Sequence, residues 1–257
     1  MLIKARLNLL KKTKDGSKKL LKKIYNFIPC IFTFLNAIFG FISILKSFDN
    51  NYRMATICIA IAGLMDLADG KIARALGLCS YFGMELDSLS DAISFCLAPT
   101  LLIYCWSSYT DLSYWHISIL FFYMCAGIAR LAKFNIDAAN NMNNKIKNKS
   151  NFIGLPTTAS ALFIVSIVLA FDNIIYNNAL YTDIIFCLIA MTSALMISNL
   201  KFKSIKNINI FSLSTISFAM LNILAVYSLG FRFIFAEFVI YIVFNIINNI
   251  KLNYKRI

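Results

Sequence analysis

Four aspartates, Asp66, Asp69, Asp87 and Asp91, lie inside two strongly apolar stretches of the chain. Their spacings of three and four residues place each pair on one face of a helix. An unpaired charge near the centre of a membrane helix costs about 2.5 kcal/mol or more, so four such carboxylates require a counter-charge. Clustered hard oxygen ligands favour Mg²⁺ or Mn²⁺, and two such ions can hold the oxygens of a phosphoryl or pyrophosphoryl group.

A short basic turn separates the two pairs of aspartates. In an antiparallel hairpin centred near residue 78, Asp66 falls opposite Asp91 and Asp69 falls opposite Asp87. At about 1.5 Å rise per residue, all four lie within roughly 20 Å of the turn. The spacing therefore predicts a four-carboxylate pocket near one end of two neighbouring helices, within reach of a lipid headgroup.

The composition is that of an integral membrane protein. Of 257 residues, 60% are hydrophobic and 23 are Phe, and the mean hydropathy is +0.72, far more apolar material than a soluble core of this size can hide. About 20 apolar residues span a membrane as a helix. We therefore predict an all-α polytopic membrane helix bundle with about eight spans, near residues 27–46, 53–68, 84–107, 115–130, 156–171, 181–198, 208–229 and 233–249.

The net charge of +13 fits a membrane topology better than nucleic-acid binding. With a cytoplasmic N-terminus and eight spans, 22 of the 25 Lys and Arg residues fall in cytoplasmic segments, which is the positive-inside pattern. We divide the chain into a basic segment, 1–26, and a transmembrane domain, 27–257. The basic segment is either an amphipathic helix on anionic headgroups or a solvated tail that fixes topology. The polar segment 135–151 is predicted to be a cytoplasmic loop.

Cysteine and histidine carry no predicted chemistry. The seven cysteines are scattered, mostly within apolar runs, and are interpreted as small core residues. His116, the single histidine, sits beside Trp115 at a predicted membrane boundary. Histidine-dependent triads and zinc sites are therefore not expected.

Three further residues of the hairpin suit a phosphate ligand. Gly70 and Gly83 lack a side chain, which lets either a ligand or a neighbouring helix approach the backbone, and both interpretations stay open. Arg74 supplies a permanently charged cation for phosphate oxygens.

The hairpin resembles the CDP-alcohol phosphatidyltransferase family. Its signature, D-x2-D-G-x2-A-R-x8-G-x3-D-x3-D, is matched at every fixed position, by Asp66, Asp69, Gly70, Ala73, Arg74, Gly83, Asp87 and Asp91. The resemblance implies a six-helix core, here with two helices added, and transfer of a phosphoalcohol from a CDP-alcohol to a hydroxyl with release of CMP. It implies that Asp66, Asp69, Asp87 and Asp91 bind metal and that Asp91 is the general base. It assigns the CDP moiety to Gly70, Ala73, Arg74, Ser80 and Gly83, with Thr33 and Asn36 as further contacts.

Other segments resemble the membrane-embedded phosphatidylserine synthase branch. They are IPCIFTFLNAIFGF from Ile28, GIARLAKFN from Gly127, NFIGLPTTASA from Asn151 and LMISNLKFKSIK from Leu195. Cys30 and Lys133 depart from the pattern expected there. The branch implies CDP-diacylglycerol and L-serine as substrates, phosphatidylserine as product, a homodimer among membrane lipids, and a bacterial inner membrane with the site facing the cytoplasm.

The acceptor is less narrowly defined than the reaction type. Four basic residues at predicted cytoplasmic boundaries could pair a serine carboxylate: Arg130, Lys133, Lys201 and Lys203. Asn135 could orient the ammonium end, although boundary Lys and Arg residues also simply set topology. Inositol phosphate and glycerol 3-phosphate are alternative acceptors for the same chemistry. A cation transporter lined by the four acids is the alternative from another class, but it explains neither Arg74 nor the paired glycines.

Overall fold

A computed structural model of the chain describes residues 29–76, 81–107, 112–144, 152–171, 179–198, 200–202 and 232–254. The predicted basic segment 1–26 and the predicted span 208–229 lie outside these residues.

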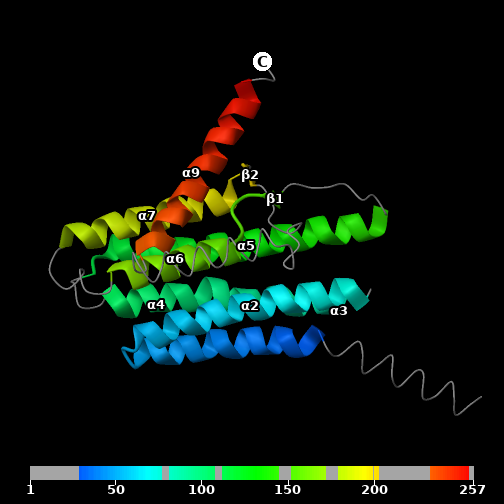
Figure 1. Cartoon of the computed structure of the whole chain (residues 1–257), viewed down its shortest axis with the longest axis horizontal. Helices are drawn as coiled ribbons and strands as arrows, with labels where there is room; N and C mark the ends of the chain where they lie inside the picture. The colour runs from blue at the N-terminus through cyan, green and yellow to red at the C-terminus, as the bar shows by residue number, and fades with distance from the viewer. Residues whose placement is uncertain are drawn as a thin grey trace, which may run out of the picture.

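The described residues are almost entirely helical, as predicted (Figure 1). Three consecutive elements, α3, η1 and α4, join into one continuous helix, Tyr81–Ser107, so that seven helices are seen within the described residues. Each of these seven coincides with one predicted span. The helical elements are Pro29–Phe48, α2 (Tyr52–Leu76), α3 (Tyr81–Asp91), η1 (Ala92–Leu97), α4 (Ala98–Ser107), α5 (Tyr114–Asn144), α6 (Thr157–Phe171), α7 (Ala179–Ile197) and α9 (Arg232–Tyr254).

Four helices are long and apolar enough to cross a membrane: Pro29–Phe48, Tyr81–Ser107, Tyr114–Asn140 and Leu180–Ile197. Helix α2 is comparable in length but carries five charged residues, including Asp66 and Asp69. The apolar helix α6 is shorter, at 15 residues. The structure thus confirms seven of the eight predicted segments as helices, and four of these helices meet the length and hydropathy of a membrane span.

One small sheet departs from the all-α prediction. Strands β1 (Phe152–Ile153) and β2 (Lys201–Phe202) pair antiparallel and tie the connection before α6 to the one after α7. Gly154 follows β1 with φ 85°, and its N–H donates to the Leu200 carbonyl at 2.8 Å. A Cβ there would lie 2.5 Å from the Met196 carbonyl oxygen, so this crossing point requires glycine.

Helix α5 corrects a second prediction. Residues 135–144 were expected in a loop, but they continue α5 to Asn144. At about 1.5 Å rise per residue, this 31-residue helix is longer than the roughly 30 Å thickness of a bilayer core. Helix α5 is therefore longer than a single crossing requires. Asn135 is buried and hydrogen bonded to α3, which holds this polar turn in helical form.

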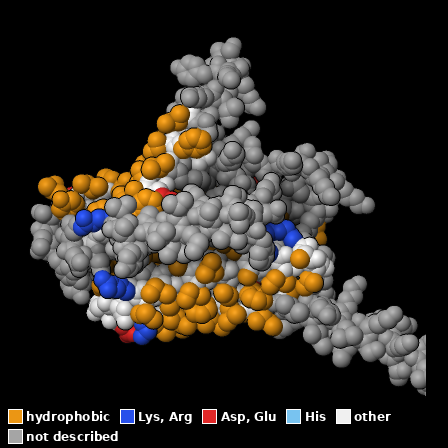
Figure 2. Space-filling model, viewed as in Figure 1, with side chains coloured by type: hydrophobic (Ala, Val, Ile, Leu, Met, Phe, Trp, Pro, Cys, Tyr) orange, Lys and Arg blue, Asp and Glu red, His pale blue; other side chains and the backbone are white. Residues whose placement is uncertain are grey.

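The first helix has an inverted amphipathic pattern. Its exposed stripe is apolar and consists of Ile31, Phe34, Ile38, Phe41, Leu45 and Phe48; its buried stripe is polar and consists of Thr33, Asn36, Ser43 and Ser47. Figure 2 shows a broad hydrophobic surface along this edge of the molecule. Such an arrangement suits lipid outside and a polar site inside.

The core forms around α6. This helix packs against α2, α4, η1, α7 and α9, and α5 packs most extensively on α7. Large fully buried side chains fill the layer, among them Leu102, Phe163, Ile164 and Phe186. In Figure 1, α9 crosses the other helices obliquely and extends beyond them. The first helix, α2 and the α3–α4 helix lie on the opposite side of the bundle and carry the predicted site.

Candidate active site

The predicted aspartates occupy the two helix segments that flank the turn. Asp66 and Asp69 lie in the last three turns of α2, and Asp87 and Asp91 lie on α3. Helix α2 ends at Leu76 and helix α3 begins at Tyr81, as the predicted hairpin requires.

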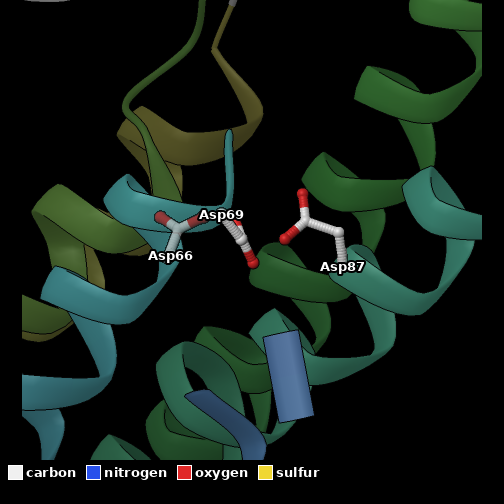
Figure 3. A group of neighbouring side chains, drawn as sticks. All are labelled: Asp66, Asp69 and Asp87. Carbon is white, nitrogen blue, oxygen red and sulfur yellow. The ribbon is translucent and has the colours of Figure 1, made fainter. Parts of the chain in front are cut away.

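Three of the carboxylates form a compact cluster. Asp66, Asp69 and Asp87 each offer one oxygen, and these oxygens lie within 4.8 Å of one another. Figure 3 shows Asp69 and Asp87 facing each other across the space between the two helices, with Asp66 beside them on α2. Asp69 is buried, while the other two are half-buried. Three hard oxygen donors so close together repel one another unless a cation neutralises them, so the donor set fits Mg²⁺ or Mn²⁺.

Asp91 lies beside this cluster rather than within it. Its side chain is 8% exposed, and its charge interacts with those of the three clustered carboxylates. One oxygen, Oδ1, accepts a hydrogen bond of 3.0 Å from the Asn36 amide. The predicted register pairs Asp66 with Asp91; in the structure Asp66 groups with Asp69 and Asp87, and Asp91 has its own partner on the first helix.

Thr33 and Asn36 both contact carboxylates. The Thr33 hydroxyl hydrogen bonds to Asp69 Oδ2 at 2.9 Å, and it also lies 3.2 Å from the Pro29 carbonyl. The resemblance implies nucleotide contacts for Thr33 and Asn36. In the structure each of them hydrogen bonds to one carboxylate. Thr33 contacts Asp69 of α2, and Asn36 contacts Asp91 of α3.

The remaining signature residues surround the cluster on the turn side. A Cβ on Gly70 would find its nearest atoms, at 3.7 Å, in the Arg74 guanidinium of the same helix, so packing of a neighbouring helix does not account for this glycine. Arg74 is exposed, and Ala73 and Gly83 are half-buried. Ser80 is outside the described residues.

A π-helical segment, which was not predicted, directly follows Asp91. In η1, the Ala98 N–H donates to the Ile93 carbonyl, a five-residue separation that widens the turn. Ser94 donates to the Asn36 carbonyl at 2.8 Å, and Tyr123 on α5 donates to the Phe95 carbonyl at 3.0 Å.

Two glycines bring the flanking helices against this segment. A Cβ on Gly40 of the first helix would lie 2.8 Å from the Ser94 Cα and overlap its hydroxyl. A Cβ on Gly127 of α5 would lie 3.3 Å from the Cys96 Cβ and overlap its sulfur. The turn after Asp91 is therefore held from both sides. The only sequence signal for this arrangement is the pair of glycines in apolar helices, which is weak by itself.

The predicted acceptor residues lie on the neighbouring α5. Asn135 is 9% exposed; its Oδ1 accepts from the Ser88 hydroxyl at 2.7 Å, and its Nδ2 donates to Glu85 at 3.1 Å. Glu85 is thereby placed beside Asn135. The Arg130 guanidinium is close enough to interact electrostatically with Asp91, and Lys133 is exposed.

The cysteines and the histidine lie apart from this chemistry. All six cysteines within the described residues are free. His116 is buried, and its Nε2 lies 3.1 Å from Asp183 of α7. It sits about 28 Å along α5 from Asn135, at about 1.5 Å per residue, and links two helices.

Comparison with known proteins identifies a family and several relatives. The family model of CDP-alcohol phosphatidyltransferase matches residues 26–202. The chain is 39% identical over 152 residues to the archaetidylserine synthase of Methanothermobacter thermautotrophicus, covering 58% of this chain and 61% of that protein. It is 32% identical over 150 residues to the CDP-diacylglycerol–serine O-phosphatidyltransferase of Bacillus subtilis, covering 58% and 80%. A protein of the same name from Methanocaldococcus jannaschii is 35% identical over 146 residues, covering 57% and 62%.

The structure is a helical bundle with a carboxylate cluster between two neighbouring helices. The chain belongs to the CDP-alcohol phosphatidyltransferase family. Family membership and the four apolar helices together indicate an integral membrane protein. The matched region spans less than two thirds of the archaetidylserine synthase and of the M. jannaschii protein.

Proposed function

We propose that the protein transfers the phosphatidyl group of CDP-diacylglycerol to the hydroxyl of L-serine, giving phosphatidylserine and CMP. The observation that carries this proposal is the cluster of Asp66, Asp69 and Asp87 with Asp91 beside it, in a family member whose relatives include named serine phosphatidyltransferases. The family sets the reaction type, and the names of the relatives favour serine.

A divalent metal fits the carboxylates, and two ions agree with the number of ligands. Asp66, Asp69 and Asp87 would hold Mg²⁺ or Mn²⁺, with Asp91 as a further ligand. Such ions supply charge neutralisation for the pyrophosphate and for the leaving group. In this proposal, the CDP moiety lies over the turn end of the hairpin, against Gly70, Ala73, Arg74, Ser80 and Gly83.

Asp91 is proposed as the general base. Its carboxylate takes the proton from the serine hydroxyl, whose oxygen attacks the phosphorus that bears the diacylglycerol. A new oxygen–phosphorus bond forms, and the bond from that phosphorus to the bridging pyrophosphate oxygen breaks. CMP leaves as a phosphate anion, which the exposed Arg74 guanidinium can stabilise.

The serine site is proposed between α3 and α5. Arg130, which interacts electrostatically with Asp91, and Lys133 would pair the serine carboxylate. Asn135 and the Glu85 carboxylate bonded to it would face the ammonium group. The two charged ends of serine then find opposite charges while its hydroxyl points towards Asp91.

The charge pattern completes the proposal. Eight spans, a cytoplasmic N-terminus and a site facing the cytoplasm account for the distribution of Lys and Arg. This topology fits a bacterial inner membrane, where CDP-diacylglycerol enters the site sideways from the lipid and serine arrives from the cytoplasm. A homodimer is proposed from the resemblance alone.

A panel of acceptors tests the function. Purified protein receives labelled CDP-diacylglycerol with serine, inositol phosphate or glycerol 3-phosphate, and the lipid product is identified. We expect phosphatidylserine and CMP in equal amounts with serine alone. Product with a phosphorylated acceptor instead would refute serine as the substrate. Cation flux in liposomes without any lipid product would refute the transferase and favour the transporter.

A further inference from the structure

We propose that Asn36 is a positioning residue that sets the orientation of the Asp91 carboxylate. The inference rests on the proposed function, since it concerns the group that accepts the proton. It differs from the nucleotide contact that the family resemblance implies for Asn36.

The contact between these two residues is direct and closed to solvent. Asn36 is 0% exposed, and its Nδ2 donates to Asp91 Oδ1 at 3.0 Å. An asparagine amide does not titrate, so this donor is present at any pH. With Oδ1 engaged, Oδ2 is the oxygen left to receive a proton.

The backbone on both sides of this bond is fixed as well. The Asn36 carbonyl accepts from Ser94, three residues beyond Asp91, at 2.8 Å. One turn along the first helix, Gly40 allows the two backbones to approach at Ser94. Asn36 and Asp91 thus face each other across a helix contact held at two further points.

Burying the Asn36 amide also costs free energy of folding that side-chain packing alone does not offset. Asn36 Oδ1 is buried and has no hydrogen-bond partner in the described part of the chain. A buried acceptor without a partner destabilises the fold, and the bond from Nδ2 to Asp91 Oδ1 is the hydrogen bond that offsets the burial of this amide. The contribution of Asn36 at this helix contact is therefore its bond to Asp91.

Steady-state kinetics of Asn36→Leu test the inference against the nucleotide contact. We expect kcat to fall about 10- to 100-fold, the usual effect of removing a hydrogen bond that orients a catalytic or ligating group. The KM for CDP-diacylglycerol should stay within about twofold of the wild-type value, because binding of the donor lipid does not need the base. Asn36→Ser, which keeps a short donor, should recover part of the lost kcat.

Ser43→Ala is the matched control, because Ser43 is equally buried on the same helix and its hydroxyl has no hydrogen-bond partner in the described part of the chain. It should leave kcat and KM at wild-type values. Wild-type kcat in both Asn36 variants would overturn the inference, and so would a raised KM for CDP-diacylglycerol with kcat unchanged. A wild-type protein that forms no lipid product with any acceptor would instead refute the proposed function itself.

Discussion

Replacing Gly40 with alanine tests how closely the first helix must approach the turn after Asp91. The new Cβ would lie 2.8 Å from the Ser94 Cα, a backbone atom that no rotamer change can move. Ordinary contact begins near 3.4 Å, so the two helices must separate by about 0.6 Å. Overpacking of this kind costs about 1–3 kcal/mol. The better helix propensity of alanine returns about 0.5–1 kcal/mol.

We therefore expect Gly40→Ala to lose about 1–2 kcal/mol of stability, which lowers the Tm by roughly 2–8 °C for a chain of this size. Because the Asn36–Asp91 bond spans the same contact, kcat should fall as well, by up to about 100-fold for a displacement approaching 1 Å. Thermal unfolding in detergent and serine transfer by the same preparation measure both effects.

Gly63→Ala on α2 is the matched control. Its Cβ would meet only Phe95 Cε1, at 3.9 Å, so the propensity gain should appear without a clash. We expect an unchanged or slightly higher Tm and normal turnover. Equal Tm and equal turnover in the two variants would show that the first helix does not press on Ser94, and the reasoning about Gly40 would be wrong.

Three further predictions concern the chemistry. Asp91→Asn should retain CDP-diacylglycerol binding while turnover falls about 10²- to 10⁴-fold, as expected for loss of a general base; wild-type turnover would refute that role. Removing divalent metal with a chelator should abolish transfer, and added Mg²⁺ or Mn²⁺ should restore it, with Asp69→Asn requiring more metal; activity in full chelator would exclude the metal site. Asn135→Leu should raise the KM for serine about tenfold, as for the loss of one hydrogen bond of about 1.4 kcal/mol, and leave the KM for CDP-diacylglycerol unchanged; an unchanged KM for serine would remove Asn135 from the acceptor site.

Local periodicity was enough to predict the hairpin that carries the aspartates. Spacings of three and four residues fix which side chains share a helix face, and the turn between them fixes which residues can meet. Asp69 and Asp87 accordingly face each other. The sequence also identified the helices, because apolar runs of about membrane length have few alternatives to helix.

The position of Asp91 could not be derived in this way. Its surroundings depend on a hydrogen bond from Asn36, which lies 55 residues before it, and on η1, whose Phe95 carbonyl accepts from Tyr123, which lies 32 residues after Asp91. No periodicity marks a π-helical turn within an otherwise regular apolar run. The helical continuation of α5 through Asn135 was missed for a similar reason, since hydrogen bonds to Ser88 and Glu85 outweigh the weak helix propensity of asparagine.

The wide turn of η1 holds one residue more than a regular α-helical turn. Losing a single residue there would rewind the segment into a regular α-helix and leave the two halves of Tyr81–Ser107 in nearly the same rotation. Losing a residue between Asp87 and Asp91, where the helix is regular, would instead rotate the residues before the deletion by about 100° against the half that ends in the buried Trp106. A one-codon deletion in η1 would therefore keep the acids of α3 facing those of α2, whereas the same deletion four residues earlier would swing Asp87 away from Asp66 and Asp69.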